Sequence, residues 1–331
     1  MSRKKILWGA AAFTGVLIAA VFFLFLHSDV RKKQKQEITD IRTIRVMAPY
    51  SAGVHKKTLE AAAQGYEKDH PETAVEIEYI PEENYKREIG LRQDEENNAD
   101  IIICSSSAMP PLIQMGVFRE LQMTPEKRNR YVQGIPWENV MDDGKYYGLP
   151  FFYDPYLLFY NKKSMEENQV DPPSTWEEII QAGARIQTLG TYGFGFAAKN
   201  SEETAQFFSM MLYSRGGSIY SLDRAQGIQC FQDIQDMVQM NILPANLINT
   251  SQEDLARRFA EGEVHMMVNQ LSCLTVLKSS GTSMEIGMTR VPGEITDMIY
   301  LTGQNIGLTV NAREEAEDFL DYLFEPEVYE S

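Results

Sequence analysis

The order of elements at the start of the chain constrains the fold more than any other sequence feature. Apolar, strand-like segments at residues 43–48, 75–79 and 101–103 alternate with segments of helical pattern at 58–66 and 82–95. Strands that are joined through helices lie parallel in one sheet, because parallel neighbours need a crossover connection. The chain is therefore expected to be an α/β protein with a parallel sheet covered by helices.

The loops that follow these strands contain candidate ligand contacts. In parallel sheets of this kind, ligands bind beyond the carboxyl ends of the strands. Tyr50 and Ser51 follow the first strand, and Ser105 and Ser106 follow the third. Each of the four is a candidate binding residue, with an ordinary solvated loop as the alternative interpretation.

Composition excludes several classes of function. With 331 residues and 44% hydrophobic content, the chain is large enough for roughly two domains. A formal net charge of -16 disfavours a nucleic-acid partner, because phosphate neutralisation requires lysine and arginine. The four histidines have no metal-ligand spacing, and the three cysteines are widely separated, which predicts buried thiols. No catalytic constellation is present, so the sequence predicts no enzyme, metal or cofactor.

The amino end predicts a membrane segment. Basic residues at positions 3–5 precede an uncharged run over residues 6–26 that is long enough to span a bilayer. We expect a signal-anchor helix within residues 1–27, followed by a polar tether over residues 28–40. The folded part would then lie outside the cytoplasm at the cell membrane, and cleavage to a secreted form is the alternative.

An aromatic run leads directly into a helix start. Six aromatic residues lie between positions 151 and 160 around Asp154-Pro155, which is unusual for a buried strand. After the prolines at 172–173, residues 174–178 hold two overlapping capping-box patterns, which predict a helix from Trp176.

Helical patterns return further along the chain. Phe231, Ile234 and Val238 share one helical face, and Ser251-x-x-Asp254 fits another capping box.

Four blocks of sequence then occur in a recognisable order. They are GLP at 148–150 with FYNK at 159–162, PPSTWEE at 172–178, FAEGEVHMM at 259–267, and residues 303–310 followed by the helical pattern at 316–323. In this order they resemble the extracellular solute-binding proteins of ABC importers, of the sugar-binding, maltose-binding-protein-like type. The resemblance covers most of residues 43–325.

This resemblance implies an α/β, two-lobed periplasmic-binding-protein-like fold with a hinge and an interlobe cleft. The first lobe would contain residues 41–150 and about 284–312, and the second would contain 151–283 and about 313–331. Members of the family usually continue for tens of residues beyond the helix that here ends near Phe324, so the carboxyl-terminal part is expected to be shortened.

The resemblance also nominates residues in the aromatic run. It places residues 150–161 on a strand that passes between lobes, with Asp154 where maltose-binding protein carries a ligand-contacting acid. A carboxylate accepts hydrogen bonds from sugar hydroxyls, and aromatic rings stack on C–H faces, so Phe152 and Tyr153 join Asp154 as candidates. The alternative is that Asp154-Pro155 makes a turn and the rings belong to the core.

Two further positions complete the candidate set. Asn269 and Gln270 stand where the family strand usually continues to a cleft tryptophan, and their amides could hydrogen-bond a ligand. Gln304 lies on the expected crossover strand.

The resemblance implies capture of a carbohydrate, either an oligosaccharide or another polyol, between the lobes and its delivery to ABC permease subunits. The alternative is a membrane-anchored sensor or scaffold that keeps the fold without transport. The shortened carboxyl end and the absent tryptophan favour this alternative.

Overall fold

The computed structural model describes residues 41–49, 54–92, 99–129, 136–295 and 299–329. Tyr50, Ser51, the predicted anchor and the tether lie outside the described residues. Within the described ranges, no helix has the length and apolar character needed to cross a bilayer. The chain forms two compact units: unit 1 takes the described parts of residues 1–79, 94–102 and 311–331, and unit 2 takes those of 80–93 and 103–310.

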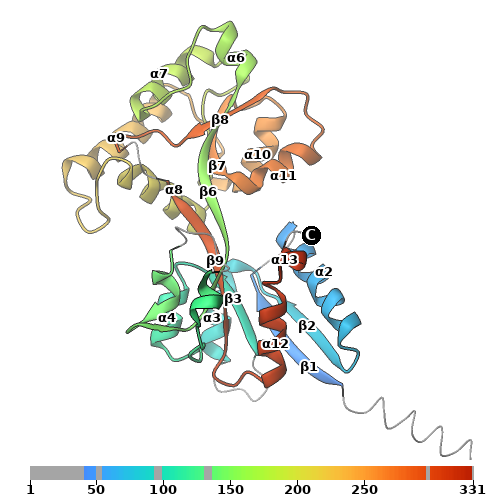
Figure 1. The fold of residues 1–331 in the computed structure, drawn as a ribbon. Helices are drawn as coiled ribbons and strands as arrows, with labels where there is room; N and C mark the ends of the chain where they lie inside the picture. Colours follow the sequence, from blue (N-terminus) through green and yellow to red (C-terminus); the bar gives the residue numbers. More distant parts are fainter. Residues whose placement is uncertain (1–40, 50–53, 93–98, 130–135, 296–298, 330–331) are drawn as a thin grey trace, which may run out of the picture. The chain divides into compact units, whose positions relative to one another are not determined.

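Unit 1 contains the predicted parallel sheet. Its strands are β1 (Arg42–Ala48), β2 (Thr73–Tyr79) and the first residues of β3 (Ile101–Ser105), and β1 pairs in parallel with both neighbours. Figure 1 shows α2 (Val54–Asp69) and α12 (Glu314–Tyr322) beside these strands. The short α13 (Pro326–Tyr329) follows. The predicted alternation of strands and helices is thus confirmed.

The last long helix belongs to unit 1. Phe319 of α12 packs edge-on against Tyr66 of α2, with ring centroids 5.0 Å apart. The sequence places residues 313–331 in the lobe of residues 151–283, and the structure differs. The apolar face of α12, which includes the fully buried Ala316, instead packs on β1, and its aromatic residues contact Tyr66 of α2.

Unit 2 is organised around the long strand β6 (Leu149–Asn161). The other strands are β4 (Met141–Asp142), β5 (Lys145–Tyr146), β7 (Met266–Gln270), β8 (Ile286–Arg290) and β9 (Leu301–Leu308), with the end of β3. The first half of β6 pairs antiparallel with β9, and its second half pairs antiparallel with β7 and β8. The second half of β6 is therefore held on both sides by distant segments of the chain, and its first half is held by β9.

The aromatic run is one continuous strand despite its two prolines. Pro150 lies beside an irregularity in the β6–β9 ladder, and Pro155 lies where β6 changes partner from β9 to β7 and β8. Proline has no N–H to donate, so it fits where a ladder is already interrupted. The alternative interpretation of Asp154-Pro155 as a turn is wrong.

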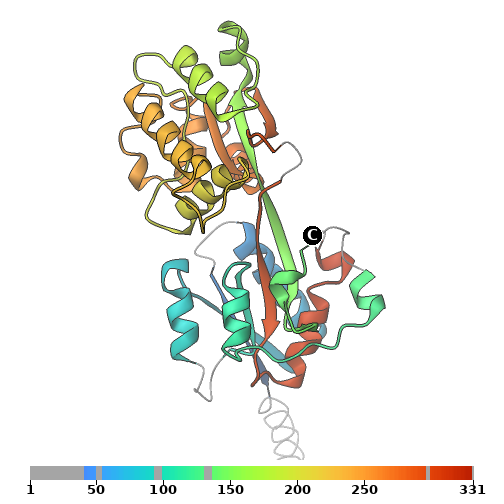
Figure 2. The ribbon, with the colours of Figure 1, turned by 90° about the vertical axis from the view of Figure 1, so that its left-hand side faces the viewer.

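Helices and short 3-10 segments surround the strands of unit 2. They are α3 (Glu82–Leu91), α4 (Met109–Gln114), α5 (Pro125–Asn129), η1 (Glu138–Val140), α6 (Lys162–Glu167), α7 (Trp176–Ile186), α8 (Glu202–Tyr213), α9 (Ala225–Gln239), η2 (Leu247–Asn249), α10 (Gln252–Ala260), η3 (Leu271–Cys273) and α11 (Leu274–Ser279). Figure 2 shows α7, α8 and α9 gathered beside β6. Their shared core includes Trp176, Phe194 and Phe207. The three cysteines are buried, as predicted.

Helix α9 forms where the sequence predicts a helix, but it buries a different face. Its buried residues include Cys230, Asp233 and Met237, whereas Phe231 and Val238 are exposed. A charged residue can occupy the inner face because Arg215 pairs with Asp233. A distant partner therefore overrides the apolar pattern.

Two of the predicted capping boxes are present. Thr175 and Glu178 cap α7, and Ser251 and Asp254 cap α10, each with reciprocal side-chain to backbone hydrogen bonds. These bonds satisfy N–H groups that a helix start would otherwise leave unpaired.

Replacing Ser251 with alanine is expected to reduce the free energy of unfolding by about 1 kcal/mol, the usual cost of a lost cap. The Ser251 Oγ accepts from the N–H of Asp254 at 3.1 Å, and alanine removes this bond. Ser201→Ala is the matched control, because Ser201 holds the N-cap position of α8 without making a capping bond. Urea unfolding should show a clearly larger loss for S251A than for S201A, and equal losses would contradict this role.

Candidate functional site

Three strands of unit 2 bring the main candidate residues together. In the β6–β9 ladder Phe152 lies opposite Gln304, and Asp154 lies opposite Thr302. Directly opposed residues share a face of the sheet, so these four side chains lie on one face. Gln270 at the end of β7 joins them through a hydrogen bond to Thr302. We call Gln304, Thr302, Asp154 and Gln270 the polar row.

Hydrogen bonds fix the geometry of the polar row. The Gln270 Nε2 donates to the Thr302 Oγ1 at 2.5 Å, and that hydroxyl donates to the backbone oxygen of Asp154 at 3.0 Å. Thr302 therefore bridges a side chain of β7 to the backbone of β6. Because the Thr302 hydroxyl uses its hydrogen for the Asp154 carbonyl, it can only accept from Gln270, and the amide nitrogen of Gln270 therefore faces Thr302.

The Asp154 side chain is anchored and almost enclosed. The residue is 7% exposed, and its Oδ1 accepts the N–H of Ser272 in η3 at 3.1 Å. Burial raises the pKa of the neighbouring Cys273 thiol, and the Asp154 charge raises it further. The carboxylate therefore has a structural partner at one oxygen and a fixed orientation in the polar row.

Two buried polar atoms beside these residues lack partners among the described residues. The Gln304 Oε1 and the Ser106 Oγ are buried and have no partner at normal hydrogen-bond geometry among the described residues, although Ser106 lies close enough to the Tyr153 hydroxyl to lower its pKa. The Ser106 N–H donates to the Gly303 carbonyl at 3.0 Å, which places Ser106 next to the β9 residue that precedes Gln304. An unsatisfied buried polar atom costs about 1–3 kcal/mol, so such atoms are suited to bind ligand or water.

Tyr153 lies opposite Gly303 in the same ladder. Its hydroxyl donates to the Pro136 carbonyl at 3.0 Å, and the residue is half-buried. Burial raises the pKa of Tyr153, and the Glu138 carboxylate contributes to the rise. Because successive side chains of a strand alternate, the Tyr153 ring lies on the face of the β6–β9 ladder opposite the polar row, with its hydroxyl already engaged.

The remaining predicted residues differ in their surroundings. Asn269 is fully buried, with its Nδ2 donating to the Gln252 carbonyl at 2.9 Å and its Oδ1 accepting from the Gln270 N–H at 2.8 Å. Because both ends of this amide are used inside the chain, Asn269 supports the fold of β7. Ser105 is half-buried, and its Oγ lies 3.1 Å from the Ser107 Oγ.

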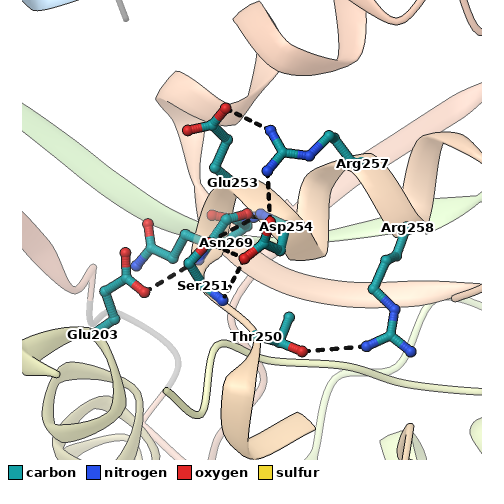
Figure 3. Close-up of polar contacts among 9 residues, drawn as sticks. Glu203, Thr250, Ser251, Glu253, Asp254, Arg257, Arg258 and Asn269 are labelled. Carbon is teal, nitrogen blue, oxygen red and sulfur yellow. Dashed lines mark hydrogen bonds and ion pairs between the residues drawn. The ribbon is translucent and has the colours of Figure 1, made fainter. Parts of the chain in front are cut away.

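A second polar cluster beside β6 was not predicted from the sequence. Figure 3 shows the start of α10, where Glu203 reaches from α8, and its Oε2 accepts the N–H of Gln252 at 3.2 Å. The Gln252 side chain donates to the Tyr156 hydroxyl, which in turn donates to Gln206 at 2.9 Å. Tyr156 thus connects α8 and α10 to β6. Neither this cluster nor Thr302 has a local sequence signal, because both depend on strand register and packing.

Burial also changes the pKa of Glu203. It raises the pKa of this carboxyl group, so the charged form costs free energy in the folded state. A carboxyl group whose pKa is raised by folding contributes most to the free energy of unfolding when it is protonated, below its ordinary pKa of about 4.3. This contribution is lost as the pH rises through the folded-state pKa. Glu203 therefore lowers stability at neutral pH relative to an uncharged isostere.

Glu203→Gln is expected to melt at a higher temperature than the wild type at about pH 7, with the advantage disappearing near pH 4. Glutamine keeps an acceptor for the Gln252 N–H while removing the charge. Melting curves at both pH values measure the difference, and the exposed Glu253→Gln on α10 serves as a control for a lost surface carboxylate. A lower melting temperature for E203Q at pH 7 would contradict the effect of burial.

Comparison with known proteins identifies related sequences. Residues 52–330 match the family model described as bacterial extracellular solute-binding protein. A curated relative, the multiple sugar-binding protein of Streptococcus mutans serotype c, is 21% identical over 340 residues, which cover 97% of this chain and 78% of that protein.

Solved structures share the fold. Maltose-bound T. maritima MalE3 superposes with a TM-score of 0.75 at 20% identity, covering 85% of this chain and 76% of that one. A solute-binding protein from Agrobacterium radiobacter K84 in complex with ribitol gives a TM-score of 0.77 at 14% identity, covering 88% and 78%. These likenesses establish a two-lobed α/β fold of the solute-binding type.

Proposed function

Because this chain belongs to the bacterial extracellular solute-binding proteins, which are binding proteins and not enzymes, we propose that it captures a carbohydrate for an ABC transporter. The solute would be an oligosaccharide or another polyol, bound outside the cytoplasm and delivered to the permease subunits. Related proteins are named for sugars or were solved with maltose or ribitol, which supports this class of ligand.

The observation that carries the proposal is the pairing of Phe152 with Gln304. The two residues are opposite each other on one face of the sheet, both are half-buried, and the Gln304 Oε1 has no partner among the described residues. A sugar offers hydroxyl donors to such an acceptor and a C–H face to such a ring. Asp154, two residues from Phe152, adds a carboxylate acceptor of fixed orientation.

We also propose that residues 6–26 tether the protein to the membrane. The basic residues before this uncharged run and its length support the proposal. Recovery of the protein in the membrane fraction after a carbonate wash would test it, and release into the medium would contradict it.

Gln304→Leu is expected to weaken carbohydrate binding by about tenfold or more, equivalent to about 1.4 kcal/mol, because it removes the acceptor but keeps the bulk. The variant should fold as stably as the wild type, since the lost oxygen has no partner among the described residues. The measurement is calorimetric titration of the full-length protein with the carbohydrate that shifts its melting temperature. Gln181→Leu on the exposed side of α7 is the control. Unchanged affinity in Q304L would contradict the placement of the site.

A further inference from the structure

The charged groups that act on this part of β6 are carboxylates. Asp154 lies within the polar row and is 7% exposed. Burial raises the pKa of Tyr156, and the charges of Glu203 and Asp154 raise it further. Burial also raises the pKa of Tyr153, and the charge of Glu138 raises it further. Three carboxylates from separate segments, Asp154, Glu203 and Glu138, therefore lie close enough to residues 153–156 to add negative potential there.

Among the described residues, no cation pairs with Asp154, the carboxylate of the polar row. The hydrogen bonds that hold the row come from the neutral groups of Gln270, Thr302 and Ser272 in the described part of the chain. Lys199 lowers the pKa of Glu203, but burial outweighs it and the net shift is upward.

Both arginines of α10 already form ion pairs with acidic side chains. Arg257 pairs with Glu253 and Asp254, both at 2.5 Å, as Figure 3 shows. Arg258 pairs with Glu263 at 2.5 Å. An acidic ligand at the polar row would therefore have to displace existing ion pairs before either arginine could bind it.

The consequence concerns the charge of the solute. An anionic ligand here would lose hydration, gain no cationic partner among the described residues of the polar row and meet a fixed carboxylate in a poorly hydrated site. A neutral ligand instead donates hydroxyls to the Gln304 Oε1 and to Asp154. We infer that the site selects neutral polyhydroxyl solutes and rejects their carboxylated and phosphorylated counterparts. This inference rests on the proposed function and defines its substrate class.

The test uses pairs of solutes of similar structure, in which one member is neutral and the other carries a carboxylate or a phosphate. The full-length protein is titrated calorimetrically with glucose and glucuronate, galactose and galacturonate, xylobiose and its aldobiouronic acid, and ribitol and ribitol 5-phosphate. For any pair that binds, the anionic member should have a dissociation constant at least about tenfold higher. Equal or tighter binding of the anionic member overturns the inference while leaving carbohydrate binding intact. Absence of binding by every neutral and anionic member overturns the proposed function and the inference with it.

Two variants assign the selectivity to the carboxylates. Asp154→Asn keeps an acceptor for the Ser272 N–H and removes the charge, so the preference for the neutral member should fall at least severalfold. Glu203→Gln, which keeps the acceptor for the Gln252 N–H, should reduce the preference in the same direction by a smaller factor. Because Glu203 lies outside the polar row, the E203Q variant still tests the electrostatic explanation if D154N fails to fold. An unchanged ratio in the folded variants would overturn the electrostatic explanation.

Discussion

Replacing Asp233 with alanine is expected to reduce the free energy of unfolding by about 3–5 kcal/mol, the usual cost of stranding one partner of a buried ion pair. The side chains of Arg215 and Asp233 are only 7% and 6% exposed, and they form an ion pair. Gln229 also donates to the Asp233 Oδ1 at 2.8 Å, and the guanidinium lies 5.9 Å from the centre of the Trp176 ring. Without Asp233, the arginine charge remains among core residues.

Glu294→Ala provides a control on the same cation. The Glu294 Oε1 lies 3.7 Å from the Arg215 Nε, but this side chain is 58% exposed. An exposed ion pair contributes at most about 1 kcal/mol, so urea unfolding should separate the two variants clearly. The double variant Arg215→Met, Asp233→Leu should recover most of the loss, because apolar replacement of both partners is often neutral. Equal effects of D233A and E294A would contradict the account.

The second large effect is expected in unit 1, where Asp100→Ala should cost about 2–4 kcal/mol by removing three hydrogen bonds to a charged acceptor. The Asp100 carboxylate accepts from the N–H of Arg45 at 2.8 Å, from the N–H of Arg313 at 3.0 Å and from the Arg313 Nη1 at 2.6 Å. The side chain of Asp100 is 2% exposed and that of Arg313 is 39% exposed. The arginine can therefore be rehydrated, but the two backbone donors lose their acceptor.

Differential scanning calorimetry of matched variants tests this prediction. Asp100→Asn keeps one acceptor oxygen and should lose less stability than D100A. Glu76→Ala removes an exposed acid 3.7 Å from Arg45 and should cost less than about 1 kcal/mol. If D100A lost no more stability than E76A, the hydrogen bonds of Asp100 would not stabilise the packing of α12 on β1, and this would contradict the prediction.

Features that depend on local sequence were predictable. The alternating elements of unit 1 follow from periodicity, and the caps at Thr175 and Ser251 follow from side chains within three residues. The resemblance carried by the four blocks is confirmed by the family match over residues 52–330. Phe152 and Gln304 were both candidates from the sequence, and the structure places them opposite each other.

Features that depend on distant partners were not predictable. The continuity of β6 through Pro155 depends on where three other strands pair with it. The buried face of α9 depends on Arg215, and the position of α12 depends on a sheet more than 200 residues earlier in the chain. Thr302 enters the polar row only because the register sets it opposite Asp154. Asn269 was a candidate for binding a ligand through its side-chain amide, but that amide hydrogen-bonds backbone groups of Gln252 and Gln270 instead.

The central claim, carbohydrate capture, is tested most directly by thermal melting of the full-length protein against a panel of neutral sugars, polyols and amino acids. The protein should be purified in a detergent without a sugar headgroup, so that no carbohydrate is present beforehand. A solute at about 100 times its dissociation constant should stabilise the folded state by about 2.7 kcal/mol, which raises the melting temperature by a few degrees. We predict such a shift with at least one neutral carbohydrate or polyol. A cooperative melt that no carbohydrate or polyol moves, or a shift with amino acids alone, would contradict the claim.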